Sequence, residues 1–231
     1  MNQRITNLRT KMKAQDLKAV LINNLKNVYY LTGFWGSNGT VLVTEERVVL
    51  FTDSRYTIHA HATCFPFVEI VETRNELEEA AKIVKDAAIH ELGFEDEITV
   101  AYQTRLATTF SGVSLRALSD FVMEFRLIKD ETEVATIRKA CSISDQAFLD
   151  VLEFIKVGQT TELEAATFLD FRMRELGASG VSFDIISAAG ERSAMPHATP
   201  SDRIISAGDA LTLDFGCLYN HYVSDMTRTI Y

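Results

Sequence analysis

The feature that most constrains the fold is a stretch near the C-terminal end, residues 211–230, in which an apolar pattern is interrupted by two aspartates. Apolar residues alternate with polar or small ones over residues 211–215, and β-branched and aromatic residues fill the following arm. Such a pattern is typical of two paired β-strands. Tyr219-Asn220 is the predicted turn, because asparagine tolerates the left-handed backbone conformation. The sequence therefore predicts a β-hairpin in which each arm carries one aspartate.

A hairpin centred on that turn sets Asp214 directly opposite Asp225. Two carboxylates that face each other on one side of a sheet repel and destabilise it. Divalent cations bind carboxylate oxygens and would remove this repulsion. Because both residues lie within apolar strands, we predict that Asp214 and Asp225 hold a pair of divalent metal ions. The alternative is that they are two solvated surface acids.

Asp-Phe-Gly at 214–216, followed by Ser-Asp-Met-Thr-Arg-Thr at 224–229, resembles the metallopeptidase family of methionine aminopeptidases, aminopeptidase P and prolidase. The resemblance implies an α+β catalytic domain of the pita-bread fold. It also implies two divalent ions, Mn²⁺ or Co²⁺ with Zn²⁺ as an alternative, held by five ligands that include Asp214 and Asp225. The other ligands, a histidine and two glutamates, lie further along in the family, and this sequence stops at Tyr231. We therefore expect an incomplete and inactive fragment of a longer enzyme.

The first half of the chain alternates between strand and helix patterns, which is typical of an α/β domain. Tyr30-Leu-Thr-Gly-Phe34 and Thr52-Asp-Ser-Arg-Tyr56 resemble the N-terminal domain shared by aminopeptidase P, prolidase and creatinase. Asp53 is expected to cap the next helix, with Arg55 solvated or ion-paired; substrate contact across a dimer or domain interface is the alternative. The expected elements are strands at 19–22, 40–43, 47–51 and 67–71, helices at 75–90 and 102–118, and a structured turn without a regular element at 28–39.

We place a domain boundary within residues 123–129. Residues 1–124 then form the creatinase/prolidase-like α/β domain, and residues 125–231 form the first part of an α+β pita-bread domain. Asp130 and Glu133 have the spacing of a helix capping box.

Beyond that capping box, the pattern predicts a long amphipathic helix that Gly158 ends. Thr160-Thr-Glu162 opens a second helix, and the resemblance implies that residues 182–187 form the first central strand of the pita-bread domain.

Residues 190–197 are predicted to form a loop. His197 matches the substrate-side histidine of the family, and the resemblance implies that it donates a hydrogen bond to the scissile carbonyl or to the oxyanion. An ordinary capping or surface histidine is the alternative. Thr227 and Arg228 match the family phrase after the second aspartate and are expected to support the hairpin through hydrogen bonds. His221 is expected at the surface.

Composition narrows the classes of partner. A net charge of −9 argues against nucleic acid as a partner. No apolar run approaches the ~20 residues of a membrane-spanning helix, and no secretory signal is visible. Cys64, Cys141 and Cys217 are widely spaced, which indicates reduced thiols in a cytoplasmic protein, and none is expected as a metal ligand.

The resemblance implies a metal-dependent exopeptidase that hydrolyses the Xaa-Pro bond and releases the N-terminal residue of peptides with proline at the second position. It also implies a homodimer. The N-terminal domain and the loop at 193–197 favour this proline-specific branch over methionine aminopeptidases. Two alternatives stay open. A creatinase-type amidinohydrolase has the same fold without metal, which the presence of both Asp214 and Asp225 disfavours. A non-catalytic relative would use the fold to bind peptides or proteins.

Overall fold

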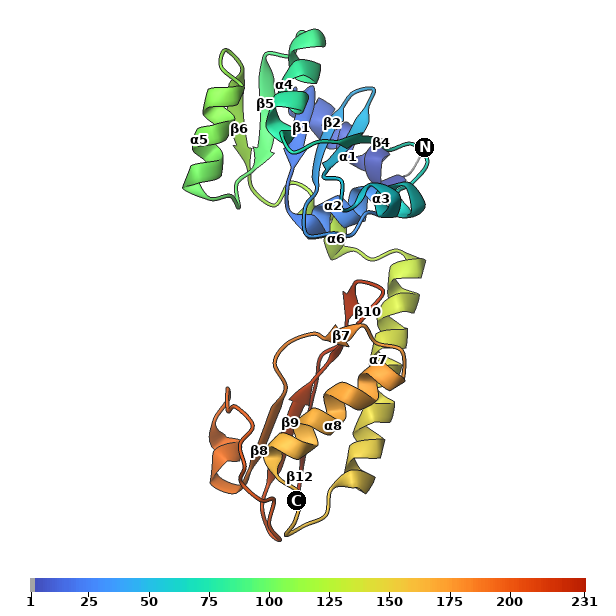
Figure 1. The fold of residues 1–231 in the computed structure, drawn as a ribbon, viewed down its shortest axis with the longest axis vertical. Coiled ribbons are helices and arrows are strands. Elements are labelled where there is room, and N and C mark those ends of the chain that lie inside the picture. The colour runs from blue at the N-terminus through green and yellow to red at the C-terminus, as the bar shows by residue number, and fades with distance from the viewer. Residues whose placement is uncertain (1–2) are drawn as a thin grey trace. The chain divides into compact units, whose positions relative to one another are not determined.

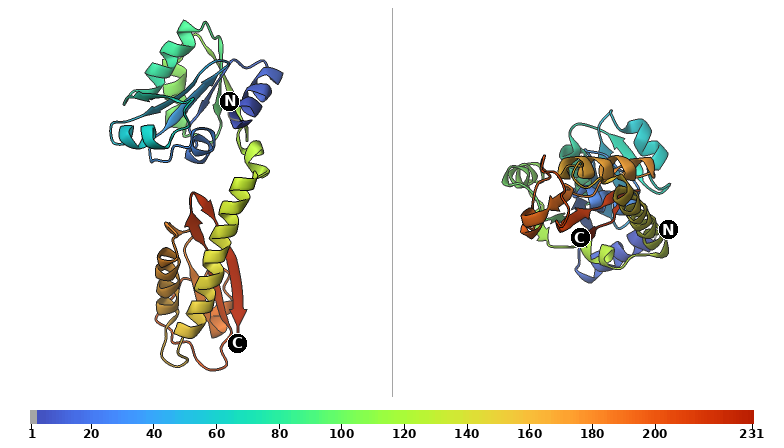
Figure 2. Two further views of the ribbon diagram at one scale, coloured as in Figure 1. Left: turned by 90° about the vertical axis from the view of Figure 1, so that its right-hand side faces the viewer. Right: turned by 90° about the horizontal axis from the view of Figure 1, so that it is seen from below.

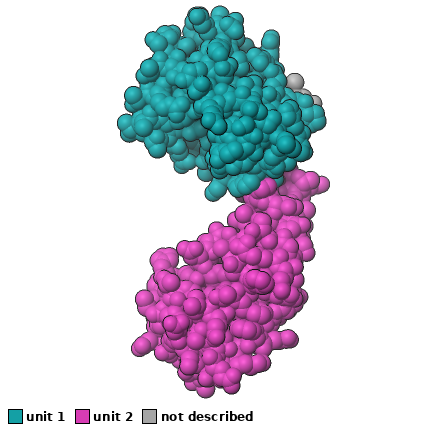
Figure 3. Space-filling view, viewed as in Figure 1, with its two compact units in different colours: residues 1–128 teal, residues 129–231 magenta. Residues whose placement is uncertain are grey.

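The computed structural model describes residues 3–231, which divide into two compact units (Figure 3). Unit 1 ends at Ile128 and unit 2 begins at Lys129. The division falls four residues after the expected end of the first domain at residue 124, because α6 (Met123–Leu127) belongs to unit 1. Phe125 of this helix packs against the core of unit 1, and Arg126 donates a hydrogen bond to Asn27.

Unit 1 contains a mixed six-stranded sheet in the order β4-β3-β2-β1-β5-β6 (Figure 1). β1 pairs antiparallel with β2 and parallel with β5, and β2 and β3 form an antiparallel hairpin. The outer pairs β3–β4 and β5–β6 are parallel. The predicted α/β class of this half is confirmed. The strands are β1 (Ala19–Ile22), β2 (Thr40–Thr44), β3 (Val48–Thr52), β4 (Glu69–Glu72), β5 (Glu91–Glu95) and β6 (Ser114–Leu118).

Two hydrophobic cores form with this sheet. Val20 and Ile22 of β1 lie in one core, whereas Leu21 lies in the other. Successive side chains of a strand point to opposite faces, so the central strands read as continuous apolar runs. The first core includes apolar residues of α1 and α2, and the second includes those of α4 and α5. The helices before α6 are α1 (Gln3–Ala14), α2 (Leu25–Thr32), α3 (Thr57–Thr63), α4 (Glu76–Asp86) and α5 (Val100–Thr109).

The structured turn predicted at 28–39 is wrong for its first part, because residues 25–32 form α2. Asn24 caps this helix by accepting hydrogen bonds from the backbone N–H groups of Lys26 and Asn27. Gly33 ends it with a φ of 79°. Asparagine and glycine are therefore the two caps of a short helix here, although each is also a turn signal.

The helix predicted over 102–118 is also wrong at its end. Residues 114–118 form β6, which pairs in parallel with β5 over its whole length. The pairing partner lies more than twenty residues away in the sequence, so local periodicity did not reveal it.

Replacing Asn24 with alanine is expected to lower the free energy of unfolding of unit 1 by about 1 kcal/mol, because α2 loses its side-chain cap. Asn75→Ala is the matched control, since Asn75 precedes α4 without a capping hydrogen bond from its side chain. Trp35 is the only tryptophan of the chain and lies in unit 1, so its fluorescence during urea unfolding measures the effect. Equal losses in the two variants would contradict the assigned cap.

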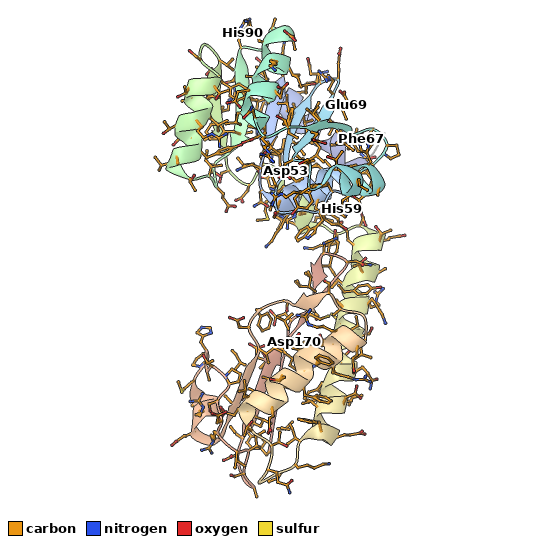
Figure 4. The ribbon with its side chains drawn as sticks, viewed as in Figure 1. Asp53, His59, Phe67, Glu69, His90 and Asp170 are labelled. Carbon is orange, nitrogen blue, oxygen red and sulfur yellow. The ribbon has the colours of Figure 1, made fainter. Side chains whose placement is uncertain are left out.

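Asp53, labelled in Figure 4, is nearly buried just after β3, and both of its carboxylate oxygens bind the Arg55 guanidinium at 2.8 Å. Asn38 donates a further hydrogen bond at 2.7 Å. Hydrogen bonding from Arg55 is the main reason that the pKa of Asp53 lies well below its usual range. The expected ion pair is confirmed. The expected helix cap is wrong, because Tyr56 occupies the N-cap position of α3.

Unit 2 combines two long helices with two antiparallel three-stranded sheets, in the orders β11-β10-β7 and β12-β9-β8. α7 (Glu131–Phe154) and α8 (Glu162–Glu175) lie side by side against the strands (Figures 1 and 2). One core joins Val151 of α7, Leu169 of α8 and Phe215 of β9. The expected α+β class is confirmed. The remaining elements are β7 (Gly180–Val181), β8 (Ile186–Ala189), the 3₁₀ helix η1 (Gly190–Ala194), β9 (Leu211–Phe215), β10 (Cys217–Tyr219), β11 (Tyr222–Val223) and β12 (Met226–Ile230).

The capping box at the start of α7 is confirmed. Asp130 accepts the N–H of Glu133 at 2.9 Å, and Glu133 in turn accepts the N–H of Asp130 at 2.8 Å. The strand predicted over 182–187 begins only at Ile186. Ser182 instead donates its N–H to the carbonyl oxygen of Gly216 and its hydroxyl to the carbonyl oxygen of Ser224. Residues 182–185 therefore form an irregular segment between β7 and β8.

Cys64, Cys141 and Cys217 are free thiols. Within residues 3–231, no helix combines the length and the apolar character that crossing a membrane requires.

Candidate functional site

The predicted hairpin near the C-terminal end is confirmed, but its centre lies one residue later than predicted. Tyr219 pairs with Tyr222, so the turn is formed by Asn220 and His221, whose φ angles are 45° and 68°. Positive φ at both central residues is the requirement of the common two-residue hairpin turn of type I′. His221 is exposed at this turn, as expected.

The shift of the turn changes which residue faces Asp214. Thr227 pairs with Asp214, so the prediction that Asp225 lies directly opposite is wrong. Asp225 lies two residues before Thr227, in the short gap between β11 and β12, and its side chain is exposed. In the part of the chain that the structure describes, no group of three or more His, Cys, Asp or Glu side chains could hold a metal ion.

Asp214 lies on the sheet face opposite to the buried Leu213 and Phe215. Its side chain is half-buried and accepts a 2.6 Å hydrogen bond from the Thr227 hydroxyl through Oδ1. Thr212 and Thr229 are joined by a second hydrogen bond of 3.1 Å on the same face. Thr227 therefore contacts Asp214 directly, and this face of β9 and β12 presents oxygen atoms.

The chain just before Asp225 is fixed to the core. Ser224 is buried, and its hydroxyl lies 2.7 Å from that of Ser144 on α7. The same hydroxyl accepts the N–H of Cys217 at 2.9 Å. Gly216 admits this close approach, because a Cβ atom there would lie 2.0 Å from the carbonyl oxygen of Ser224. These contacts fix the backbone of the hairpin at Ser224, the residue directly before Asp225.

His197 lies in a turn after η1 and is exposed. The loop predicted over 190–197 is partly regular, because residues 190–194 form η1, which contacts β8 and β9. The His197 side chain makes no hydrogen bond to the residues that the structure describes. The hydrogen bond that Asp214 accepts comes from Thr227 and not from His197.

Glu162 was not anticipated as a site-related residue. It is the first residue of α8 and is fully buried, and its carboxylate binds the chain on both sides of the His197 turn. In the sequence Thr160-Thr-Glu162 is an ordinary helix start, where a glutamate is normally solvated. Glu162 is buried by residues far away in the sequence, so the residues around it gave no signal of this burial.

Comparison with known proteins gives matches along nearly the whole chain. Residues 4–128 match the creatinase/prolidase N-terminal domain, and residues 135–231 match metallopeptidase family M24. An uncharacterized peptidase of Bacillus subtilis is 37% identical over 229 residues, which cover 98% of this chain and 64% of that protein. A Xaa-Pro dipeptidase of Pyrococcus horikoshii is 33% identical over 232 residues, which cover 100% of this chain and 64% of that protein.

Among solved structures, a Xaa-Pro dipeptidase from Bacillus anthracis is similar to this chain with a TM-score of 0.92 at 37% identity. The match covers 99% of this chain and 64% of that one. The chain therefore spans about 64% of the length of these relatives, as the fragment hypothesis expects.

Proposed function

Because this chain belongs to the creatinase/prolidase family of M24 metallopeptidases, we propose that the protein is a metal-dependent exopeptidase that hydrolyses Xaa-Pro bonds. The observation that carries the proposal is a match through both units to relatives described as Xaa-Pro dipeptidases. Its substrates would be peptides with proline at the second position. The activity belongs to a longer protein, meaning this chain extended to the length of its relatives.

Asp214 and Asp225 are the residues that would hold the metal ions. They fit this role in chemistry, because both are oxygen donors and such donors suit Mn²⁺ or Co²⁺, with Zn²⁺ as an alternative. The Thr227 hydroxyl donates a hydrogen bond to Oδ1 of Asp214, and the Asp225 side chain is exposed. Two carboxylates are too few for two ions, so we assign the other ligands to the part of the relatives that this chain does not cover. When bound, the metal would lower the pKa of a water molecule and polarise the scissile carbonyl.

His197 would donate a hydrogen bond to the scissile carbonyl oxygen, and this bond would strengthen as negative charge develops. Its side chain is exposed and makes no hydrogen bond within the described residues, so it is available to a substrate. We further propose a homodimer in the cytoplasm. Three free cysteines support a reducing compartment, and the family resemblance supports the dimer.

The chain of 231 residues by itself is expected to show no peptidase activity, because it supplies only two of the five expected ligands. The measurement is Ala-Pro hydrolysis with added Mn²⁺ or Co²⁺, using a preparation whose mass is verified as 25.9 kDa. Turnover by this verified chain would contradict the ligand assignment.

The substrate class is tested with the longer protein, loaded with Mn²⁺, on Ala-Pro, Ala-Pro-Ala and Ala-Ala. We expect cleavage of one or both proline substrates and none of Ala-Ala. Cleavage of the dipeptide alone would identify a dipeptidase, and cleavage of the tripeptide an aminopeptidase P type. Failure to cleave either proline substrate would overturn the proposal, and metal-independent hydrolysis of creatine would replace it with the creatinase-type reaction.

A further inference from the structure

The turn that carries His197 belongs to a long connection, residues 190–210, between β8 and β9. Because the His197 side chain is exposed and makes no hydrogen bond within the described residues, contacts elsewhere in this connection must set its place. The connection leaves the sheet after Ala189 and returns along the start of α8 through Ser201 and Arg203. We call residues 190–203 the His197 loop.

A single buried carboxylate binds both arms of the His197 loop. Glu162 is 0% exposed. Where the outgoing arm begins, it accepts the N–H of Ala189, the last residue of β8, at 2.7 Å, and on that arm it accepts the Nε–H of Arg192 at 3.0 Å. On the returning arm, it accepts the N–H of Ser201 at 3.1 Å and its hydroxyl at 2.7 Å.

Two further contacts close the His197 loop. Arg192 reaches across it and donates from Nη2 to the carbonyl oxygen of Thr199 at 2.6 Å. The first turn of α8 donates the backbone N–H groups of Glu162 and Leu163 to the carbonyl oxygens of Arg203 and Ser201, each at 3.0 Å. His197 lies between residues 192 and 199, and therefore within the part that Arg192 spans.

The hydrogen bonds to Glu162 stabilise the ionised form of its carboxylate. Burial by itself would raise its pKa, but the hydrogen bonds from Ser201, Ala189 and Arg192 outweigh burial, and the pKa lies below the ordinary value. A buried carboxylate with one arginine partner and several donors is strongly destabilised when a partner is lost. The arrangement is therefore sensitive to small changes at this one side chain.

We propose that Glu162 is a positioning residue, whose buried carboxylate clamps the two arms of the His197 loop and so sets the place of His197 toward the substrate. This inference rests on the proposed function, because it assigns Glu162 a part in the same site. A residue that only stabilised α8 would affect the whole of unit 2 instead.

Glu162→Gln is the variant that separates these roles, because it keeps the shape of the side chain. Its amide offers one acceptor oxygen, while its NH₂ group faces donors of Ala189, Ser201 or Arg192. Asp170→Asn is the matched control. Asp170, labelled in Figure 4, lies on the same helix and pairs with Arg174 at 2.7 Å, but this pair is exposed.

The first measurement is hydrogen exchange on the 231-residue chain, which needs no activity. In Glu162→Gln, amides of residues 189–201 are expected to exchange about tenfold faster, as the loss of hydrogen bonds to a charged group implies. The amides at the centre of α7 are expected to keep their rates, and Asp170→Asn is expected to change neither region. Unchanged exchange in the His197 loop, or an equal rise throughout unit 2, would overturn the proposal.

The second measurement is a double-mutant cycle in the longer protein with Ala-Pro as substrate. Glu162→Gln is expected to lower kcat about tenfold and to change KM little, because His197 acts mainly on developing charge. In a His197→Ala background, the same substitution is expected to have no further effect. An undiminished loss in that background would overturn the proposal. A wild-type longer protein that is inactive on Xaa-Pro peptides would contradict the proposed function. Hydrogen exchange would still test whether Glu162 holds the two arms of the His197 loop.

Discussion

Gly216→Ala is expected to destabilise unit 2 by about 3 kcal/mol, the upper end of the cost of overpacking a core. The added Cβ would lie 2.0 Å from the carbonyl oxygen and 2.8 Å from the carbonyl carbon of Ser224. These are backbone atoms, and Ser224 is held by its hydrogen bonds to Cys217 and Ser144. Relief of the clash would therefore require the two arms of the hairpin to separate.

The matched control for Gly216→Ala is Gly180→Ala in β7 of the same unit. There the added Cβ would meet only the flexible end of Arg174, at 3.7 Å, so we expect a change below about 1 kcal/mol. Hydrogen exchange of the buried amide of Val151 in α7, measured against urea, reports the stability of unit 2 specifically. Equal effects of the two substitutions would show that the close approach at Gly216 is not the cause.

Asp225→Asn in the longer protein is expected to reduce kcat/KM for Ala-Pro by about 10³-fold or more. A metal ion supplies several kcal/mol of transition-state stabilisation, which corresponds to a factor of this size. The amide of asparagine carries no negative charge, so it would bind a divalent cation less tightly than the carboxylate does. Asp214→Asn is expected to have a similar effect, and both variants are expected to retain less Mn²⁺ after dialysis.

Asp145→Asn serves as the control for these two substitutions, because Asp145 is an exposed acid on α7 in the same unit. We expect its activity and its metal content to equal those of the wild type. Full activity in Asp225→Asn at low Mn²⁺ would contradict the assignment of Asp225 as a ligand.

The sequence predicted those helices and strands that are determined by residues close together in the chain. The alternation over residues 211–215 predicted β9, and the spacing of Asp130 and Glu133 predicted the start of α7. Such patterns did not reveal α2, because Asn24 and Gly33 serve equally as turn residues and as helix caps. β6 was missed because its parallel pairing with β5 is a tertiary interaction.

The hairpin that carries Asp214 was predicted, but its register was not. A shift of one residue in the turn, from Tyr219-Asn220 to Asn220-His221, moves the partner of Asp214 by two residues. Asn and His both tolerate positive φ, so composition alone did not fix the centre of the turn. The burial of Glu162 depends on chain segments that meet only in the folded protein.

The most direct test of the central claim is the metal dependence of Ala-Pro hydrolysis by the longer protein. Removal of bound metal with a chelator is expected to abolish turnover, and addition of Mn²⁺ or Co²⁺ is expected to restore it. Undiminished turnover after complete metal removal, verified by elemental analysis, would contradict the claim that Asp214 and Asp225 belong to a metallopeptidase site.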